Sequence, residues 1–377
     1  MSSFIDSIKS ALLFWKKGAI LGVDIGTAFI KVVLIEKVDE KVILRNYGEL
    51  ALGPSAGMAT GQSTNLPPAK IAEELRALLK EAKISPSQTF VAIPFSASLL
   101  SIVDLPDIGK KELETMIPIE ARRYIPVPLN EVSLDWWVLP KHIPTTKVEQ
   151  TPTVANAAPV LQTTVEVIIA AIHNEVIERY ESIKRNAQIS GGPSHFEIEI
   201  FSTLRAVVGR DLSPILVIDL GASSTKLALV HEGFVHASHV ISMGAQDISL
   251  GLSRSQGISF AQAEEIKCRV GMIGDEDGRD VLAVAEILLV NIMNEATRFV
   301  EGYEQKHGTK IAKVILVGGG ARLLGLEKVV AQSFPGAVIE KGDPFARVDT
   351  AVFLGKTLKE IGPDFATALG IALKGLE

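Results

Sequence analysis

Apolar and polar residues alternate along the chain in two blocks that predict the same order of elements. In the first block, apolar runs at residues 19–23, 32–35, 41–50 and 89–94 predict four strands. Before the fourth run, apolar residues recur at helical spacing over residues 71–82, which predicts a helix with one buried face. The first block therefore reads hairpin, strand, helix, strand.

The second block repeats that order. Strands are predicted at residues 215–218, 227–230 and 234–241, a long helix from about residue 281, and a last strand at 313–317. The repetition predicts two related α/β halves with a cleft between them, so that one ligand would contact both halves.

The stretch between the blocks has no counterpart in either of them. It predicts a small α+β subdomain with strands at 98–106, 132–139 and 165–171 and helices at 110–124 and 177–187. Pro118 is expected to kink or interrupt the first of these helices, because proline lacks the backbone N–H. Residues 141–164 are rich in Thr, Pro, Ala and Val and predict an exposed excursion between two strands.

The first 18 residues form a separate segment. Its apolar residues recur at helical spacing and predict a short amphipathic helix, with Phe4, Ile8, Ala11, Leu12 and Trp15 on one face. Such a helix would lie on a membrane surface, on the protein itself or on a partner. A short helix with few cations binds membranes weakly, which favours the last two.

Composition narrows the class of protein. A hydrophobic content of 47% predicts a large buried core, and a net charge of -6 argues against nucleic-acid binding. Cys268 is the single cysteine, which excludes an internal disulfide and is typical of a reducing compartment. No apolar run approaches the ~18 to 20 residues that cross a bilayer. We therefore expect a cytoplasmic protein.

One short sequence motif, called the repeated phrase below, occurs twice, each time between two strands of a predicted hairpin. Residues 24–31 and 219–226 both read Asp, apolar, Gly, four residues, Lys. An Asp-x-Gly sequence is by itself an ordinary turn. Two copies in the same strand context favour one shared ligand site over two ordinary turns, because Asp24 and Asp219 would then point at the same place. Paired carboxylates beside phosphates are typical of Mg²⁺ held partly through water.

The same two hairpin tips suit phosphate. Gly26 and Gly221 permit positive φ, which would bring backbone N–H groups close to an oxyanion. Hydroxyl donors follow each glycine, and these are Thr27, Ser223, Ser224 and Thr225.

Two further stretches are candidates for the rest of a nucleotide. Ser259 begins a Ser-x-x-Gln capping box, so a helix starts there, and Glu264 and Lys267 share one of its faces. They would either form a solvated ion pair or face a ribose and base. Gly318, Gly319 and Gly320, followed by Arg322, come directly after a buried strand. These glycines are either a bare turn or a place where a flat ring approaches the backbone.

Taken together and in chain order, these motifs resemble those of the actin, sugar-kinase and chaperone ATPase superfamily. The two hairpins resemble its phosphate motifs, residues 317–321 resemble its adenosine motif, and the stretch from Ala263 to Lys267 resembles the adenosine-side helix of bacterial actins. Within the FtsA-like branch, the chain resembles the PilM family of type IV pilus assembly. The stretches that carry this are residues 119–126, 131–135, 243–248 and 368–373.

The resemblance implies an α/β actin-like fold, which is a duplicated ribonuclease H-like fold around a nucleotide cleft, with an FtsA-like inserted subdomain. The domain boundaries that we expect are 1–18 for the amphipathic segment, 19–96 with 191–214 and 346–377 for the first half, 97–190 for the insert, and 215–345 for the second half.

The resemblance also implies ATP and Mg²⁺ as ligands. Asp24 and Asp219 would hold the metal through waters, and the tips would bind phosphates through Gly26, Thr27, Gly221, Ser223 and Ser224. Glu264 and Lys267 would face the ribose or base, and the glycines at 318–320 with Arg322 would flank the adenine. Lys31 is expected to be a surface charge. Residues 196–200 predict a strand with alternating charge that could supply Glu197 or Glu199. Neither is assigned as a catalytic residue, and slow or absent hydrolysis is expected.

As a function, the resemblance implies an adaptor of the inner-membrane platform that serves pilus-driven twitching motility. Its partner would be the N-terminal cytoplasmic tail of a bitopic PilN-like protein, with the pilus motor ATPase as a second candidate. FtsA has a C-terminal membrane helix that residues 376–377 do not resemble, so membrane attachment is expected through the partner. A self-polymerising FtsA-like protein and a sugar kinase remain alternatives.

Overall fold

The computed structural model describes residues 18–139, 164–189, 195–273 and 279–377. The chain divides into two compact units, one of Met1–Phe95 with Glu178–Glu377 and one of Ser96–Ile177. The helix predicted for the first 18 residues and the excursion predicted at 141–164 lie, but for their last residues, outside the described ranges.

The first sheet of the larger unit contains the first copy of the repeated phrase. Its strand order is β3-β2-β1-β4-β8, where β1 to β3 are consecutive antiparallel strands and β4 and β8 run parallel to β1. The bounds are β1 Ile20–Ile25, β2 Phe29–Val38, β3 Lys41–Ala51, β4 Gln88–Ile93 and β8 His195–Ile198. In β1 only Asp24 is not fully buried, which is typical of a central strand covered on both faces.

The second sheet repeats this topology, which confirms the predicted duplication. Its order is β11-β10-β9-β12-β13, with the same antiparallel and parallel pairings. The bounds are β9 Ile215–Leu220, β10 Thr225–His231, β11 Phe234–Ile241, β12 Lys313–Val317 and β13 Val338–Lys341. The fifth strands were not predicted as members of the repeat. β8 and β13 have four residues each and carry polar side chains, so they leave no apolar run.

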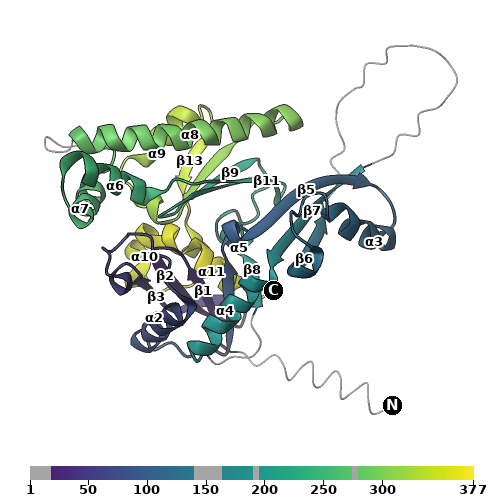
Figure 1. Cartoon of the computed structure of the whole chain (residues 1–377), viewed down its shortest axis with the longest axis horizontal. Helices are drawn as coiled ribbons and strands as arrows, with labels where there is room; N and C mark the ends of the chain where they lie inside the picture. Colours follow the sequence, from purple (N-terminus) through teal and green to yellow (C-terminus); the bar gives the residue numbers. More distant parts are fainter. Residues whose placement is uncertain (1–17, 140–163, 190–194, 274–278) are drawn as a thin grey trace. The chain divides into compact units, whose positions relative to one another are not determined.

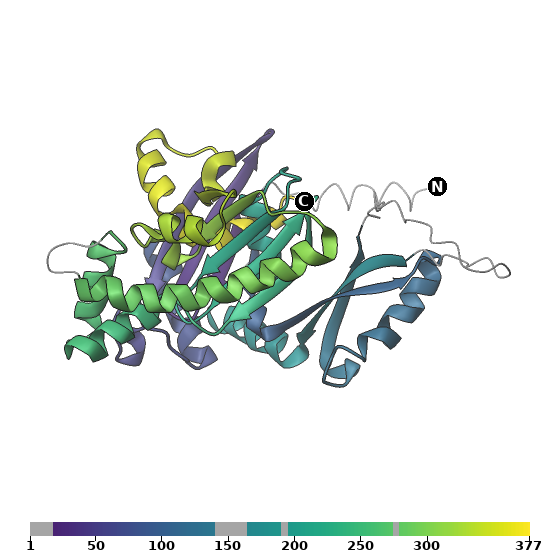
Figure 2. The same ribbon diagram turned by 90° about the horizontal axis from the view of Figure 1, so that it is seen from above.

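Helices cover both sheets of the larger unit. In chain order they are α2 Pro68–Glu81, α4 Asn174–Asn186, α5 Glu199–Val207, α6 Ala245–Gln256, α7 Phe260–Val270, α8 Arg279–His307, α9 Leu326–Ser333, α10 Gly355–Ile361 and α11 Ala366–Lys374. The long helix α8 runs across the second sheet (Figure 2) and supplies Leu289, Ile292 and Ala296 to its core. The division between the two units falls within α4.

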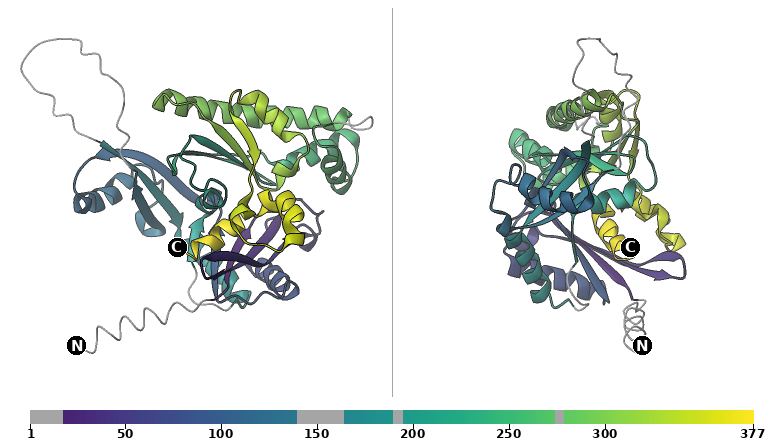
Figure 3. Two further views of the ribbon diagram at one scale, coloured as in Figure 1. Left: turned by 180° about the vertical axis from the view of Figure 1, so that it is seen from behind. Right: turned by 90° about the vertical axis from the view of Figure 1, so that its right-hand side faces the viewer.

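The two helices α5 and α11 pack directly on one another, and α11 also covers β1, β2 and β4 (Figure 3). Thr203 of α5 and Thr367 of α11 share a hydrogen bond of 2.8 Å, and Arg205 donates to the carbonyl of Gly370 at 3.2 Å. The sequence suggested a strand with alternating charge at residues 196–200. That prediction is wrong beyond residue 198, because Glu199 begins helix α5.

The smaller unit is an antiparallel sheet in the order β5-β7-β6, with helix α3 packed on it (Figure 1). The bounds are β5 Ser98–Pro106, α3 Lys110–Ala121, β6 Val132–Val138 and β7 Thr164–His173. Helix α3 continues through Pro118 and ends at Ala121, so the expected interruption does not occur and the helix is shorter than predicted. Leu113, Ile117 and Ala121 bury its apolar face against the sheet.

Among the described helices, none combines the length and the apolarity that crossing a membrane requires.

Candidate functional site

The tips of the two duplicated hairpins touch. Thr27 follows β1, Ser223 follows β9, and their hydroxyl oxygens lie 3.1 Å apart. Both tips are closed by the same turn, in which the N–H of Gly26 donates to the carbonyl of Phe29 at 2.9 Å and that of Gly221 to Ser224 at 3.0 Å. The repeated phrase thus forms a matched pair of turns that face one another.

The glycines of the tips are needed for space and not for an unusual φ. Neither Gly26 nor Gly221 has a positive φ, which corrects the expectation from sequence. A Cβ at Gly26 would lie 3.1 Å from the carbonyl oxygen of Phe29, and one at Gly221 would lie 2.9 Å from that of Ser224. Their N–H groups also close the turns, so the expected direct donation from these two groups to phosphate competes with the turn itself.

The strand register explains the spacing of the phrase. Asp24 pairs with Lys31 across β1 and β2, and Asp219 pairs with Lys226 across β9 and β10. Each lysine therefore lies directly opposite the aspartate of its own hairpin. Cross-strand neighbours of opposite charge interact on one face of a sheet, so the spacing brings a cation to each acidic tip.

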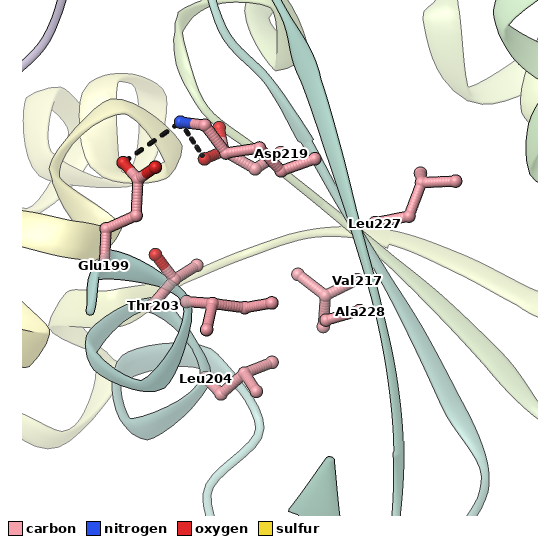
Figure 4. A pocket seen from close by; sticks show the side chains of 9 residues that line it. Glu199, Thr203, Leu204, Val217, Asp219, Leu227 and Ala228 are labelled. Carbon is pink, nitrogen blue, oxygen red and sulfur yellow. Dashed lines mark hydrogen bonds and ion pairs between the residues drawn. The ribbon is translucent and has the colours of Figure 1, made fainter. Parts of the chain in front are cut away.

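The two lysines make different contacts. The ammonium of Lys226 lies 3.2 Å from Oδ2 of Asp219 and 3.0 Å from Oε2 of Glu199. Dashed lines in Figure 4 mark these contacts at the labelled Asp219 and Glu199. The other carboxylate oxygen of Glu199 accepts a hydrogen bond of 2.7 Å from the N–H of Phe95, two residues after β4. Lys31 is only partly exposed and lies 5.8 Å from the ring of Phe29, so it is less of a surface charge than expected.

These charges perturb one another because they are screened from water. Burial, together with the charge of Glu199, raises the pKa of Asp24 to about 6, although Lys31 and Lys226 act in the opposite sense. Burial alone would lower the pKa of Lys226, but Asp219, Glu199 and Asp24 outweigh it and raise that pKa. The centre therefore holds a firmly charged ammonium and one carboxyl group that titrates close to neutral pH.

A loop from the first half closes over the tips. The N–H of Thr64 donates to the carbonyl of Thr27 at 2.8 Å, and the N–H of Ser63 donates to Oε1 of Gln246, on α6, at 2.9 Å. Gly61 lies against the carboxylate of Glu264. The loop at residues 53–68, whose sequence has no helical or strand periodicity, thus connects the first tip to helices α6 and α7.

Glu264 and Lys267 form an ion pair of 2.7 Å, but the pair is not solvated. Lys267 is 6% exposed and also donates to the carbonyl of Ala245 at 3.1 Å. Ser249 of α6 donates to the carboxylate of Glu264 at 2.5 Å. The pair therefore ties α6 to α7, and the view of it as a solvated surface pair is wrong.

The three glycines after β12 have different surroundings. A Cβ at Gly318 would collide with Asp219, and one at Gly320 would collide with Leu220, so both are needed for close packing on the end of β9. Gly319 has open space where its Cβ would be. Only this middle glycine offers an uncovered backbone to a flat ring.

Arg322 lies next to these glycines and contacts Asp364 at 3.3 Å. Burial raises the pKa of Asp364, while Lys31 and Arg322 lower it. Its Oδ1 atom is buried without a hydrogen-bond partner among the described residues. Arg322 is therefore held beside the glycine turn by an acid that sequence reasoning did not single out.

The hydroxyl residues of the second tip do not all face the same way. Thr225 is fully buried and donates to the carbonyl of Met243 at 2.8 Å, so it points into the second half and leaves the candidate set. Ser223 faces Thr27, and Ser224 supplies the carbonyl that closes the turn.

The two glutamates considered as catalytic candidates have different partners. Glu197 is held by Arg205 at 2.6 Å, whereas Glu199 belongs to the charged centre.

A hollow of about 10 Å³, roughly the space of one water molecule, extends from the charged centre between α5 and strands β9 and β10. Its walls are mostly apolar side chains, including Leu204, Val217 and Leu227, as Figure 4 shows. Neither Thr27 nor Gly319 lines it. It is therefore a hollow beneath the tips and not the place where a whole nucleotide would lie.

The residues at the tips fit a hydrated magnesium ion. No cluster of three or more His, Cys, Asp or Glu side chains in the described ranges is arranged to bind a metal directly. Mg²⁺, however, keeps several waters and needs only one or two carboxylates. Asp24 and Asp219 provide hard oxygen donors, and they are close enough for the charge of Asp219 to act on Asp24.

Two duplicated sheets joined at paired acidic hairpins define an actin-like α/β protein. The solved structure of MreB 5 from Spiroplasma citri bound to AMPPNP has this fold, with a TM-score of 0.50 and 13% identity over 95% of this chain and 96% of that one. A family model described as "Type IV pilus assembly protein PilM" matches residues 22–376. The chain belongs to the PilM family.

Two further relatives agree with this assignment. A solved structure of the PilM-PilN type IV pilus biogenesis complex matches with a TM-score of 0.74 and 27% identity, covering 95% of this chain and 98% of that chain. The cell division protein FtsA of Neisseria meningitidis serogroup B is 24% identical over 92% of this chain and 88% of its own length. The chain is thus an actin-like protein of type IV pilus assembly, related to FtsA.

Proposed function

We propose that this protein is an ATP-binding adaptor on the cytoplasmic face of the type IV pilus assembly platform. It would bind ATP with Mg²⁺ at the paired hairpin tips and dock the cytoplasmic tail of a PilN-like membrane protein, through which it would reach the inner membrane. The observation that carries the nucleotide site is the contact between Thr27 and Ser223, which unites two acidic turns at one place.

In this proposal each part of the nucleotide has its own residues. Asp24 and Asp219 hold water molecules of the metal, and Mg²⁺ supplies positive charge to the phosphates. The hydroxyls of Thr27 and Ser223 donate to phosphate oxygens, with Gly26, Gly221 and Ser224 shaping the turns around them. The open backbone of Gly319 and the side chain of Arg322 flank the adenine, and Glu264 with Lys267 lies on the ribose side.

We propose that ATP acts mainly as a conformational ligand. Glu199 is the candidate to position water against the γ-phosphate, but both of its oxygens are occupied by Phe95 and Lys226. Glu197 is bound to Arg205 and has no such role. A ligand that bridges both hairpins shifts the protein toward the closed state by its differential affinity, without hydrolysis.

Calorimetric titration with ATP in the presence of Mg²⁺ tests the nucleotide site. We expect Asp219→Ala to lower the affinity at least tenfold, because it removes a carboxylate that orders the metal's waters. Asp343→Ala is the matched control, since Asp343 is an exposed acid outside the site. If wild-type protein does not bind ATP, or if both variants bind like wild type, the proposed site is wrong.

The smaller unit offers the surface on which we propose that the PilN-like tail docks. Strand β6 is an edge strand, and Trp137 and Val138 at its end are 44% and 40% exposed. Ile119 and Tyr124, near the end of α3, are 59% and 42% exposed. Exposed apolar side chains beside an open strand edge suit an extended apolar peptide.

Titration with a synthetic N-terminal peptide of the PilN-like protein from the same organism tests this surface. We expect Trp137→Ala to weaken binding about tenfold, as is common for an aromatic side chain at the centre of an interface. Met58→Ala, which removes an exposed apolar side chain from the larger unit, is the control. Equal affinities of all three proteins would place the docking surface elsewhere.

A further inference from the structure

The ammonium of Lys226 joins the two halves of the larger unit by contacting one carboxylate from each. Its partner Asp219 lies at the second hairpin tip, and its partner Glu199 begins helix α5, after a strand of the first sheet. The side chains of Lys226, Asp219 and Glu199 are 19%, 15% and 8% exposed. The three charged groups therefore interact in surroundings where screening by water is weak.

The first copy of the phrase shows that this arrangement is specific to the second copy. Lys31 occupies the equivalent cross-strand position, yet no carboxylate in the described ranges lies within ion-pair distance of it. The same spacing thus places one lysine over an aromatic ring and the other between two carboxylates. Strand register alone does not force the second arrangement.

The position of Lys226 conflicts with a metal bound before the nucleotide. A hydrated divalent ion at Asp219 would need the carboxylate surface that the ammonium occupies at 3.2 Å. A second positive charge added beside a buried ammonium is repelled. An incoming polyphosphate changes this balance, because it offers the ammonium new oxygen partners and neutralises both cations.

On the basis of the proposed ATP site, we propose that Lys226 is the resident cation of this site. In the nucleotide-free protein it takes the place of the divalent ion at Asp219 and Glu199. When ATP binds, the ammonium leaves Asp219 for the phosphates but keeps its contact with Glu199, and the metal enters at Asp219 with the nucleotide. Two consequences follow, namely that the free protein binds divalent ions poorly and that ATP binding keeps part of its affinity without metal.

A titration of nucleotide-free protein with Mn²⁺ tests the first consequence. Binding is measured as the loss of the electron paramagnetic resonance signal of free Mn²⁺. Lys226→Met leaves Asp219 and Glu199 without their counter-ion, and we expect it to bind Mn²⁺ at least tenfold more tightly than wild type. Lys313→Met is the matched control, because Lys313 also bridges two carboxylates, at 2.9 Å and 3.3 Å, away from the tips. Mn²⁺ affinities of Lys226→Met and wild type within twofold would overturn the proposal.

Titration with ATP in EDTA and in Mg²⁺ tests the second consequence. We expect removal of metal to weaken ATP binding at least tenfold more in Lys226→Met than in wild type, and Lys226→Arg, which keeps the charge, to behave like wild type. If the ratio of ATP affinities in Mg²⁺ and in EDTA is the same for Lys226→Met as for wild type, Lys226 is not the resident cation. If Lys226→Met does not fold, Lys226→Gln replaces it. Absence of ATP binding by wild type would refute the proposed function instead, while the Mn²⁺ titration would still judge Lys226.

Discussion

Asp24→Asn is expected to stabilise the nucleotide-free protein at pH 7.5 by up to about 3 kcal/mol. Burial, together with the charge of Glu199, raises the pKa of the Asp24 carboxyl from 3.8 to about 6, although Lys31 and Lys226 act in the opposite sense. Keeping this group ionised above pH 6 therefore costs folding free energy that a neutral asparagine of similar shape does not cost. The value is an upper limit, because Asp24 keeps some contact with solvent.

The pH dependence of stability provides the measurement. Between pH 4 and pH 6 the folded protein holds a proton on Asp24 that the unfolded chain has released, so the stability that this group contributes is lost as the pH rises. Chemical denaturation in EDTA should show a wild-type free energy of unfolding that falls through this window relative to Asp24→Asn. Asp343→Asn, at an exposed position, should follow wild type. A variant less stable than wild type at pH 7.5 would contradict the role of burial.

The same substitution should weaken binding of ATP with Mg²⁺, because a neutral amide holds the waters of a metal less well than a carboxylate does. Asp24 would then be an example of a group retained for function at a cost in stability. A variant that is both more stable and a weaker ligand binder separates this explanation from general damage to the fold.

The part of the site built on long apolar strands could be predicted from the sequence. Strands β1, β2, β9 and β10 each contain an apolar run, so their presence and the turns between them follow from the hydrophobic pattern. Their bounds do not, because β2 extends three residues beyond the predicted run at each end. The antiparallel register then fixes which residues face each other, and the pairing of each aspartate with its lysine needs no further information.

Features that depend on packing between distant segments could not be predicted in this way. Glu199 begins a helix whose charged residues resemble an alternating strand, and its partners Phe95 and Lys226 are 104 and 27 residues away. Whether a lysine lies between two acids or over a ring is decided by those partners. For the same reason, Lys267 is buried although its helical spacing suggests a solvated pair.

Gly370 is the most demanding position that the sequence did not reveal. It lies in α11, where α11 crosses α5, and a Cβ there would collide with the backbone carbonyl of Ser202. Gly22 of β1 meets α11 in the same way, at the carbonyl of Ala368. The helix that covers the first sheet is thus in backbone contact on two sides, and neither side has a flexible side chain that can move away.

Gly370→Ala is therefore expected to destabilise the protein by about 3 kcal/mol, because one methyl group must push α11 and α5 apart. The crossing also includes the hydrogen bond between Thr203 and Thr367, which would break if the helices separated. Thermal and chemical denaturation measure the effect.

Gly302→Ala is the matched control, since Gly302 is exposed within helix α8 with no atom near its Cβ position. There the same change should stabilise the protein by about 0.5 to 1 kcal/mol, because alanine is the better helix former. Equal effects of the two substitutions would contradict this prediction, because they would show that α5 and α11 accommodate the added methyl group at little cost.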